Sequence, residues 1–390
     1  MLQEKYIRLG QWLGLIVGLY TLLLSVNLIS GGLELWVGDR LASLFIFARN
    51  PLLGLLVGLL ATALVQSSSA VTTILVGLVA GGLPVAIAVP MVMGANLGTT
   101  VTNTIASLGF LQHQDNFEKA LAAATIHDFF NLLALIILFP LEIVFHGIEN
   151  SAYWLTANLS PLVQAFPGGG NLLAPLIGWP QNTLIDLGNQ YFFPPWPGVM
   201  VTSMGGILLL TSIIRLGQGL QKLLGSKPLT WLVTLLPTSV ASPSSPLPIA
   251  QALIPLSAGA GITCLAQSSS LTTSLLVPLA ATDLMPLTVV YPVTLGANVG
   301  TCITAVLGAI ALVPPSFAGL EIALVHVLFN VLGILLIYGL PWLRPLPLRF
   351  AQTFAHRSRQ NIAWAIAYVA LLFFLLPLLG FSLPLVFNPS

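Results

Sequence analysis

Two short polar motifs lie inside otherwise apolar sequence, and their residue types suit the binding of a small anion. A glutamine followed by three serines occurs once in each half of the chain: Gln66, Ser67, Ser68 and Ser69, then Gln267, Ser268, Ser269 and Ser270. Consecutive serines point around the whole circumference of a helix, so in contact with lipid some of them would lack hydrogen-bond partners. Together the two motifs supply six hydroxyls and two amides, which could surround an oxyanion with several acceptor oxygens.

Two further blocks of sequence return in the same order and with nearly equal spacing. Gly94–Thr102 returns as Gly296–Thr304, and His127–Asn131 returns as His326–Asn330. Small residues alone would be explained as contacts between membrane helices, but three ordered polar blocks indicate an internal duplication. In membrane transporters such repeats point to broken helices that meet near the bilayer midplane. We therefore expect an all-α polytopic membrane protein with two inverted-topology repeats, containing re-entrant hairpins or broken helices.

The chemistry of these blocks favours an anion bound together with sodium ions. Helix N-termini offer N–H groups to an anion, and hydroxyl, amide and backbone oxygens are hard ligands for sodium. The glycines of the Gly94–Thr102 and Gly296–Thr304 blocks should let the backbone unwind and approach closely. Candidate phosphate ligands, besides the two Gln-Ser-Ser-Ser motifs, are Asn96 and Asn298. Candidate sodium ligands are Asp128, Thr73, Thr99, Thr100, Thr273, Ser274 and Thr301.

Asp128 is the clearest charge inside a predicted membrane span, and a buried carboxylate there is a functional candidate by default. Its counterpart in the second half is Val327, so the two halves are not equivalent. Asp128 could serve an additional sodium ion or a proton, or it could pair with His127 or another polar neighbour for structure. For His127 and His326 we favour packing and hydrogen bonding over a role in ion coupling, and Asn131 and Asn330 beside them are further candidate site residues.

Composition places the chain in a lipid bilayer. Hydrophobic residues make up 56% and charged residues 6% of the 390 residues, whereas soluble domains carry about a quarter charged residues. The net charge of +1 provides no field for binding nucleic acid. Expected membrane spans are 11–30, 118–146, 198–222, 318–341 and 361–384, and the interrupted apolar stretches 51–112 and 251–313 are the expected hairpins or broken helices.

Basic residues gather near the N-terminus, in the 222–250 linker and in 344–359, whereas 147–197 contains neither lysine nor arginine. Basic loops stay in the cytoplasm, so we expect a multi-pass protein of the cell membrane with a cytoplasmic N-terminus. The expected parts are an N-terminal transmembrane helix with a connecting segment (1–50), a first transport repeat (51–146), an extracytoplasmic loop (147–197), a transmembrane helix with a linker (198–250), a second transport repeat (251–341), and a basic cytoplasmic segment with a C-terminal transmembrane helix (342–390).

With these motifs the chain resembles the type II sodium–phosphate cotransporters and their bacterial relatives. The resemblance extends from the two Gln-Ser-Ser-Ser motifs through the other repeated blocks to Leu346–Arg349 and Phe373–Leu379. It covers most of 50–146 and 198–384. Unlike animal members, the chain has no cysteine pair in 147–197, and it ends soon after the last predicted span, which suggests a minimal bacterial form.

The resemblance implies sodium-driven import of inorganic phosphate by alternating access, with the two Gln-Ser-Ser-Ser motifs lining the phosphate and sodium sites. It also implies that Asp128 matches the aspartate of electrogenic members, which is linked to an additional sodium ion. We expect sodium as a co-transported ion and no prosthetic group.

Three alternatives stay open at this point: a symporter of another oxyanion or of a carboxylate, an anion channel, and an intramembrane hydrolase. The hydrolase is the weakest, because the sequence has no nucleophile-elbow motif and a catalytic triad needs geometry that sequence does not show. The oligomeric state does not follow from the sequence.

Overall fold

A computed structural model describes residues 2–37, 45–99, 101–165, 173–224 and 245–380, and all regular structure in these ranges is helical. Eight helical segments are long and apolar enough to cross a membrane: Gly10–Trp36, Val85–Phe110, Gln114–Phe145, Trp196–Gly219, Ile249–Ala266, Leu287–Ile310, Phe317–Tyr338 and Ala363–Gly380. The expected all-helical membrane architecture is therefore confirmed in the part of the chain that the structure describes.

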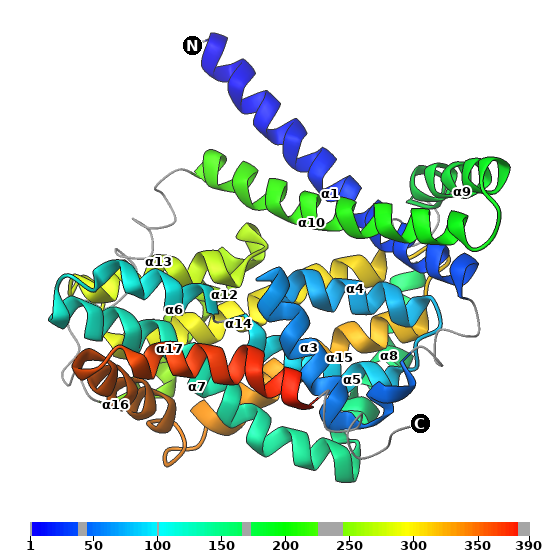
Figure 1. Cartoon of the computed structure of the whole chain (residues 1–390). Helices are drawn as coiled ribbons and strands as arrows, with labels where there is room; N and C mark the ends of the chain where they lie inside the picture. The colour runs from blue at the N-terminus through cyan, green and yellow to red at the C-terminus, as the bar shows by residue number, and fades with distance from the viewer. Residues whose placement is uncertain (1, 38–44, 100, 166–172, 225–244, 381–390) are drawn as a thin grey trace.

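Figure 1 shows how the helices are arranged in space. Their bounds in chain order are α1 (Leu2–Trp36), η2 (Ile46–Arg49), α3 (Pro51–Val65), α4 (Ser68–Ala80), α5 (Val85–Gly98), α6 (Val101–Ser107), η3 (Leu108–Phe110), α7 (Gln114–Phe145), α8 (Gly147–Ala165), α9 (Leu173–Tyr191), α10 (Trp196–Leu224), α12 (Ile249–Ala266), α13 (Ser269–Ala281), α14 (Leu287–Ile310), α15 (Phe317–Gly333), η4 (Ile334–Tyr338), α16 (Leu346–Gln360), α17 (Ala363–Val369) and η5 (Ala370–Leu375).

Each of the five spans expected from hydropathy coincides with a long helical segment, namely α1, α7, α10, α15 with η4, and α17 with η5. The interrupted stretches 51–112 and 251–313 contain three further segments of membrane-spanning length. The shorter apolar helices α3 and α4 precede the first of these segments, and α13 lies between the other two. The glycines, serines and prolines of these stretches thus separate a mixture of short and long helices.

The segment 147–197, expected as an extracytoplasmic loop, contains two 19-residue helices, α8 and α9. The helical signal in α8 is the spacing of Ile148, Ala152 and Thr156, which are buried at every fourth residue along one face. This face packs against α15. The proline, glycine and asparagine content of the segment concealed that periodicity, because Pro161 lies within α8.

The two halves of the chain pack across one another. Within each half, a pair of helices is in close contact, α3 with α5 and α12 with α14. Between the halves, α4 packs against α14 and α15, and α13 packs against α6 and α7. Helices α1 and α10 lie along each other at one side of this core, as Figure 1 shows. The short helix that follows the Gln-Ser-Ser-Ser motif in each half, α4 or α13, therefore packs against helices of the other half.

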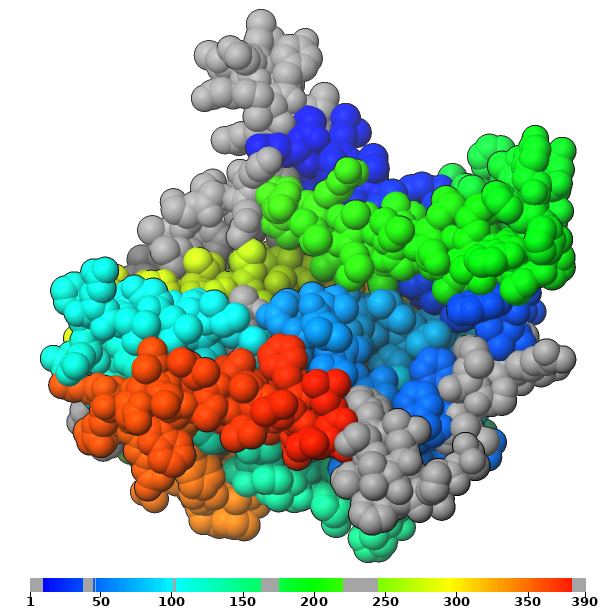
Figure 2. Space-filling model, in the orientation of Figure 1, coloured from blue at the N-terminus to red at the C-terminus, as the bar shows by residue number. Residues whose placement is uncertain are grey.

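The outer surface near the start of α7 is covered by the last helices of the chain. Helix α16 lies along α7, and α17 contacts both α16 and α6. In Figure 2 these helices, coloured orange to red, form a continuous surface beside the cyan segment that contains the turn before α7.

The repeated glycines allow close helix packing, and the unwinding expected at them is not seen in the second half. Helix α14 is continuous through Gly296 and Gly300, whereas α5 contains Gly94 and ends at Gly98. A Cβ atom placed on Gly296 would overlap the backbone carbonyl oxygen of Leu256 in α12, and one placed on Gly94 would overlap the corresponding oxygen in α3. Because the backbones touch at these positions, the helices gain contact there without losing their internal hydrogen bonds.

Candidate functional site

The first Gln-Ser-Ser-Ser motif forms a sharp break between α3 and α4. Helix α3 ends at Val65, and Gln66 takes a left-handed conformation with φ of 59°. Ser67 is extended, and its side chain accepts a hydrogen bond from the backbone N–H of Ala70 at 3.2 Å. Ser67 is thus the N-cap of α4, a position where serine is strongly preferred.

The second motif has the same geometry. Gln267 follows α12 with φ of 53°, and Ser268 caps α13 by accepting from the backbone N–H of Leu271 at 3.2 Å. Helices α4 and α13 consequently begin at equivalent residues, Ser68 and Ser269. The first turn of a helix has N–H groups without partners inside the helix, and these favour negative charge.

The serines beyond the caps are buried and keep their hydroxyls available. Ser68, Ser69 and Ser269 are at most 3% exposed, and Ser270 is half-buried. Within the described ranges of the chain, none of these four hydroxyls makes a hydrogen bond. Because these hydroxyls are not engaged by the protein, they can donate to and accept from a ligand.

The side-chain amides of the two motif glutamines donate hydrogen bonds to the helix that precedes each motif. Gln267 Nε2 donates to the backbone oxygen of Cys264 at 2.6 Å, and Gln66 Nε2 donates to the backbone oxygen of Ala63. Gln267 Oε1 accepts from the hydroxyl of Thr304 at 2.7 Å. The Gln-Ser-Ser-Ser motif of the second half is therefore joined to the end of the second repeated block.

The predicted sodium ligands are mostly helical hydroxyls that bond to the turn before them. Thr73 and Thr273 donate to the backbone oxygens of Ser69 and Ser269 at 2.7 and 2.8 Å. Similar bonds to their own helices are made by Ser274, Thr99 and Thr301. Thr100 lies outside the described residues. These hydroxyls retain lone pairs on their oxygens, so they can still act as ligands.

Asn103 of the first half forms a hydrogen bond with the second half, and the sequence analysis did not identify it. Its Nδ2 atom donates to the hydroxyl of Thr273 at 2.8 Å, and its side chain is 1% exposed. The position equivalent to Asn103 in the second half is occupied by Ala305, so comparison of the repeats could not single it out. The cross-contact between α6 and α13 was not visible in the sequence.

The repeated asparagines and histidines form a crossed hydrogen-bond network in the centre of the molecule. Asn96 Oδ1 accepts from His326 Nε2 at 3.3 Å and from Asn330 Nδ2 at 3.1 Å. In the other direction, Asn298 Oδ1 accepts from His127 Nε2, and Asn298 Nδ2 donates to Asn131 Oδ1 at 2.8 Å.

Every asparagine and histidine in this network is at most 4% exposed. The asparagine of each half therefore binds the histidine and the asparagine of the other half. This geometry is consistent with the favoured hydrogen-bonding role of the histidines, and it includes Asn131 and Asn330 in the same network.

Asp128 is fully buried on a different face of α7 from the crossed network. The hydroxyl of Tyr368, in α17, donates to Asp128 Oδ2 at 3.1 Å. The predicted alternative of a pair with His127 is not what the structure shows, because the imidazole of His127 bonds to Asn298. Asp128 therefore lies at the contact of the first half with the C-terminal helices.

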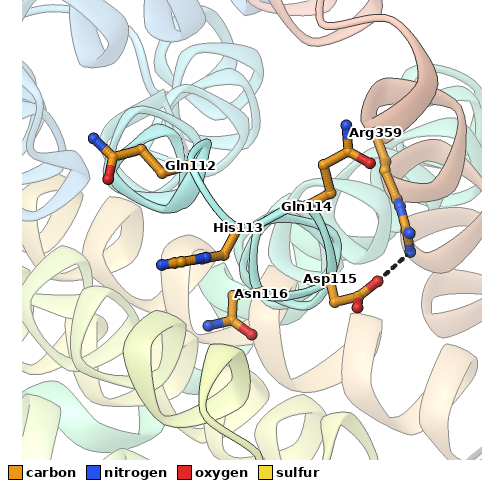
Figure 3. Close-up of a pocket in the computed structure, with 6 residues that line it drawn as sticks. All are labelled: Gln112, His113, Gln114, Asp115, Asn116 and Arg359. Carbon is orange, nitrogen blue, oxygen red and sulfur yellow. Dashed lines mark ion pairs between the residues drawn. The ribbon is translucent and has the colours of Figure 1, made fainter.

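A surface pocket lies at the corner between α6 and α7, and Figure 3 shows its lining residues. Arg359 of α16 forms ion pairs with Asp115 at 2.6 Å and with Glu118, which does not line the pocket, at 2.9 Å. The hydrogen bond to Glu118 and the nearby carboxylates raise the pKa of the Arg359 guanidinium. None of the predicted site residues lines this pocket.

Comparison with known proteins identifies the chain's relatives. The model of the family described as Na+/Pi-cotransporter matches residues 21–151 and 208–380, which contain all the repeated blocks. Sodium-dependent phosphate transport protein 2B of Homo sapiens is 32% identical over 97% of this chain and 66% of its own length. Sodium-dependent phosphate transport protein 2A of Rattus norvegicus is 30% identical over 94% of this chain and 66% of its own length.

The chain thus spans 66% of the length of these relatives, and no solved structure matches it. The relatives are named as transport proteins, and the apolar helices fit a multi-pass membrane protein. The match covers both halves of the chain and the motifs on which the resemblance was based. The chain belongs to the Na+/Pi-cotransporter family.

Proposed function

We propose that this protein is a sodium-coupled symporter that imports inorganic phosphate. The observation that carries the proposal is the duplicated helix start, in which buried serines lie at the N-termini of α4 and α13 and their hydroxyls make no hydrogen bond within the described residues. Phosphate has several acceptor oxygens and a negative charge, so it suits hydroxyl donors and free N–H groups. The names of the relatives supply sodium as the coupled ion and phosphate as the cargo.

In this proposal the phosphate ligands are the hydroxyls of Ser68, Ser69, Ser269 and Ser270, with the motif glutamines and N-cap serines shaping the site. Sodium ions bind to oxygens of the threonines and serines one turn further on, and to Asp128. Asn96 and Asn298 contribute indirectly, because their amides already bond to the opposite half. They position the two helix starts relative to one another.

The same residues suggest how access to the site alternates. Helices α3 and α4 have 15 and 13 residues, about 22 and 20 Å of helix, which is less than the ~30 Å hydrocarbon core of a bilayer. We propose that α3–α4 and α12–α13 are re-entrant hairpins of two inverted repeats, within the units 51–146 and 251–341. Movement of these units relative to the rest would open the site to one side at a time.

Electrostatic work favours the coupling of dianion import to a cation such as sodium. Moving one elementary charge across 100 mV costs about 2.3 kcal/mol, so a phosphate dianion entering a negative interior costs about 4.6 kcal/mol. Two sodium ions cancel that cost, and a third makes the membrane potential drive import. We propose that Asp128 provides for the third ion, with the N-terminus in the cytoplasm as the distribution of basic residues predicts.

The test is uptake of labelled phosphate by the purified protein in liposomes, under an inward gradient of either sodium or potassium. We expect uptake with sodium alone. Ser68→Ala and Ser269→Ala each remove a hydrogen bond to a charged group, worth about 1.5–3 kcal/mol, so uptake at low phosphate should fall roughly tenfold to hundredfold.

Ser151→Ala is the matched control, because the Ser151 hydroxyl is exposed and bonds to its own helix. Sodium-independent uptake would indicate proton coupling or a channel. Competition by other oxyanions would reveal a different cargo. Unchanged uptake by both Ser68→Ala and Ser269→Ala would show that phosphate does not bind at the N-termini of α4 and α13.

A further inference from the structure

Three side chains with metal-binding atoms converge at the corner between α7 and α8, far along α7 from the contact with α16. Glu142 lies in the last turn of α7 and is 5% exposed. Its two carboxylate oxygens accept from the backbone N–H groups of Ile148 at 2.6 Å and Glu149 at 3.1 Å. His146, in a left-handed conformation between the helices, places its Nδ1 atom 3.2 Å from Glu149 Oε2.

The distances within this cluster suit a shared cation. One ligand atom from each of Glu142, His146 and Glu149 lies within 4.8 Å of the other two. In a tetrahedral zinc site with bonds of about 2.0–2.1 Å, neighbouring ligand atoms are about 3.3 Å apart. The pair formed by His146 Nδ1 and Glu149 Oε2, 3.2 Å apart, already has this separation.

A third carboxylate, from the other half of the chain, points to a missing positive charge. Glu321 of α15 is 6% exposed and makes no hydrogen bond or ion pair within the ranges that the structure describes. Helix α15 packs against α8, where the charge of Glu149 repels that of Glu321. Sequence offers no basic partner, because 120–214 and 228–343 contain neither lysine nor arginine. Buried carboxylates without a counter-charge are costly, and a bound cation would relieve that cost.

A purely structural role accounts for only part of this arrangement. Glu142 caps the first turn of α8, and one carboxylate is sufficient for that role. It leaves unexplained why an imidazole and two further carboxylates gather at the same corner. The imidazole also bears on which ion would bind, since calcium and magnesium prefer oxygen ligands and imidazole suits zinc and similar metals.

We propose that Glu142, His146 and Glu149 form a binding site for a divalent transition-metal cation of the zinc class, with Glu321 next to it as an outer partner. The cation neutralises the carboxylates and joins the end of α7 to the start of α8 beside α15. This site is separate from the serine motifs, and it stands whether or not the protein carries phosphate.

The experiment is equilibrium binding of Zn²⁺ to the purified full-length protein in detergent, measured by calorimetry, with Ca²⁺ and Mg²⁺ for comparison. We expect one Zn²⁺ per chain at this site, and at least a tenfold loss of affinity in His146→Gln and in Glu149→Gln. Both side chains are partly exposed, so these variants should fold.

His113→Gln is the matched control, because His113 is an exposed histidine at the opposite end of α7. The proposal is overturned if the wild-type protein binds no Zn²⁺, if His146→Gln binds it as tightly as wild type does, or if Ca²⁺ binds equally well and without dependence on His146.

Discussion

Replacing single glycines in α12 by alanine tests whether backbone contact between α12 and α14 holds the second half together. Gly259 and Gly261 are two residues apart on this helix. A Cβ atom at Gly259 would overlap the backbone carbonyl oxygen of Val293 in α14, whereas a Cβ atom at Gly261 would meet nothing within 4 Å. The two substitutions add the same methyl group to the same helix, so their difference isolates the helix–helix contact.

The two substitutions should change the free energy of unfolding in opposite directions. Gly259→Ala forces α12 and α14 apart, and overpacking of this kind costs about 1–3 kcal/mol or more when only backbone can move. Gly261→Ala removes a flexible residue from a helix interior, which stabilises by up to about 1 kcal/mol. The two variants should therefore differ by about 2–4 kcal/mol in the free energy of unfolding.

Thermal unfolding of the purified variants in detergent, followed by far-UV circular dichroism, measures the difference. The midpoint of Gly259→Ala should fall by several degrees relative to wild type, and that of Gly261→Ala should stay the same or rise. Equal midpoints for the two variants would refute the inference that these glycines serve close packing. A lowered midpoint for Gly261→Ala alone would show that α12 faces a different neighbour.

Two further substitutions test the polar centre. Asn298→Ala leaves His127 and Asn131 with buried polar atoms lacking partners, at about 1–3 kcal/mol each. We expect a marked drop in the unfolding midpoint, which the exposed control Asn158→Ala should not show. Asp128→Asn should lower the charge moved per phosphate by about one in voltage-clamped membranes. An unchanged ratio of charge to phosphate would exclude Asp128 from the additional sodium site.

The membrane architecture could be predicted because it depends on composition. A long apolar run in a bilayer must satisfy its backbone hydrogen bonds internally, and a helix does this. Each of the five predicted spans is helical. Helices α8 and α9 could not be found this way, since they combine polar residues, prolines and an apolar face. Their helical state depends on burial of that face against α15 and α10, which is tertiary information.

The repeat identified the polar residues but not their partners. Sequence comparison pairs Asn96 with Asn298 and His127 with His326. In the fold, however, each asparagine bonds to the histidine of the opposite half, because α5 and α14 pack against α15 and α7 respectively. The glycines were misjudged for a similar reason. Glycine permits both unwinding and close approach, and only the neighbouring helix decides between them.

The crossed network separates the repeated polar residues into two kinds that mutation can distinguish. The asparagine and histidine side chains already bond to one another across the halves, so their loss must weaken the fold as well as any transport. The serines that begin α4 and α13 make no such bonds, so their loss should impair phosphate uptake and leave stability nearly unchanged. A site built from free hydroxyls on a fully bonded amide scaffold can hold its geometry while its ligands come and go.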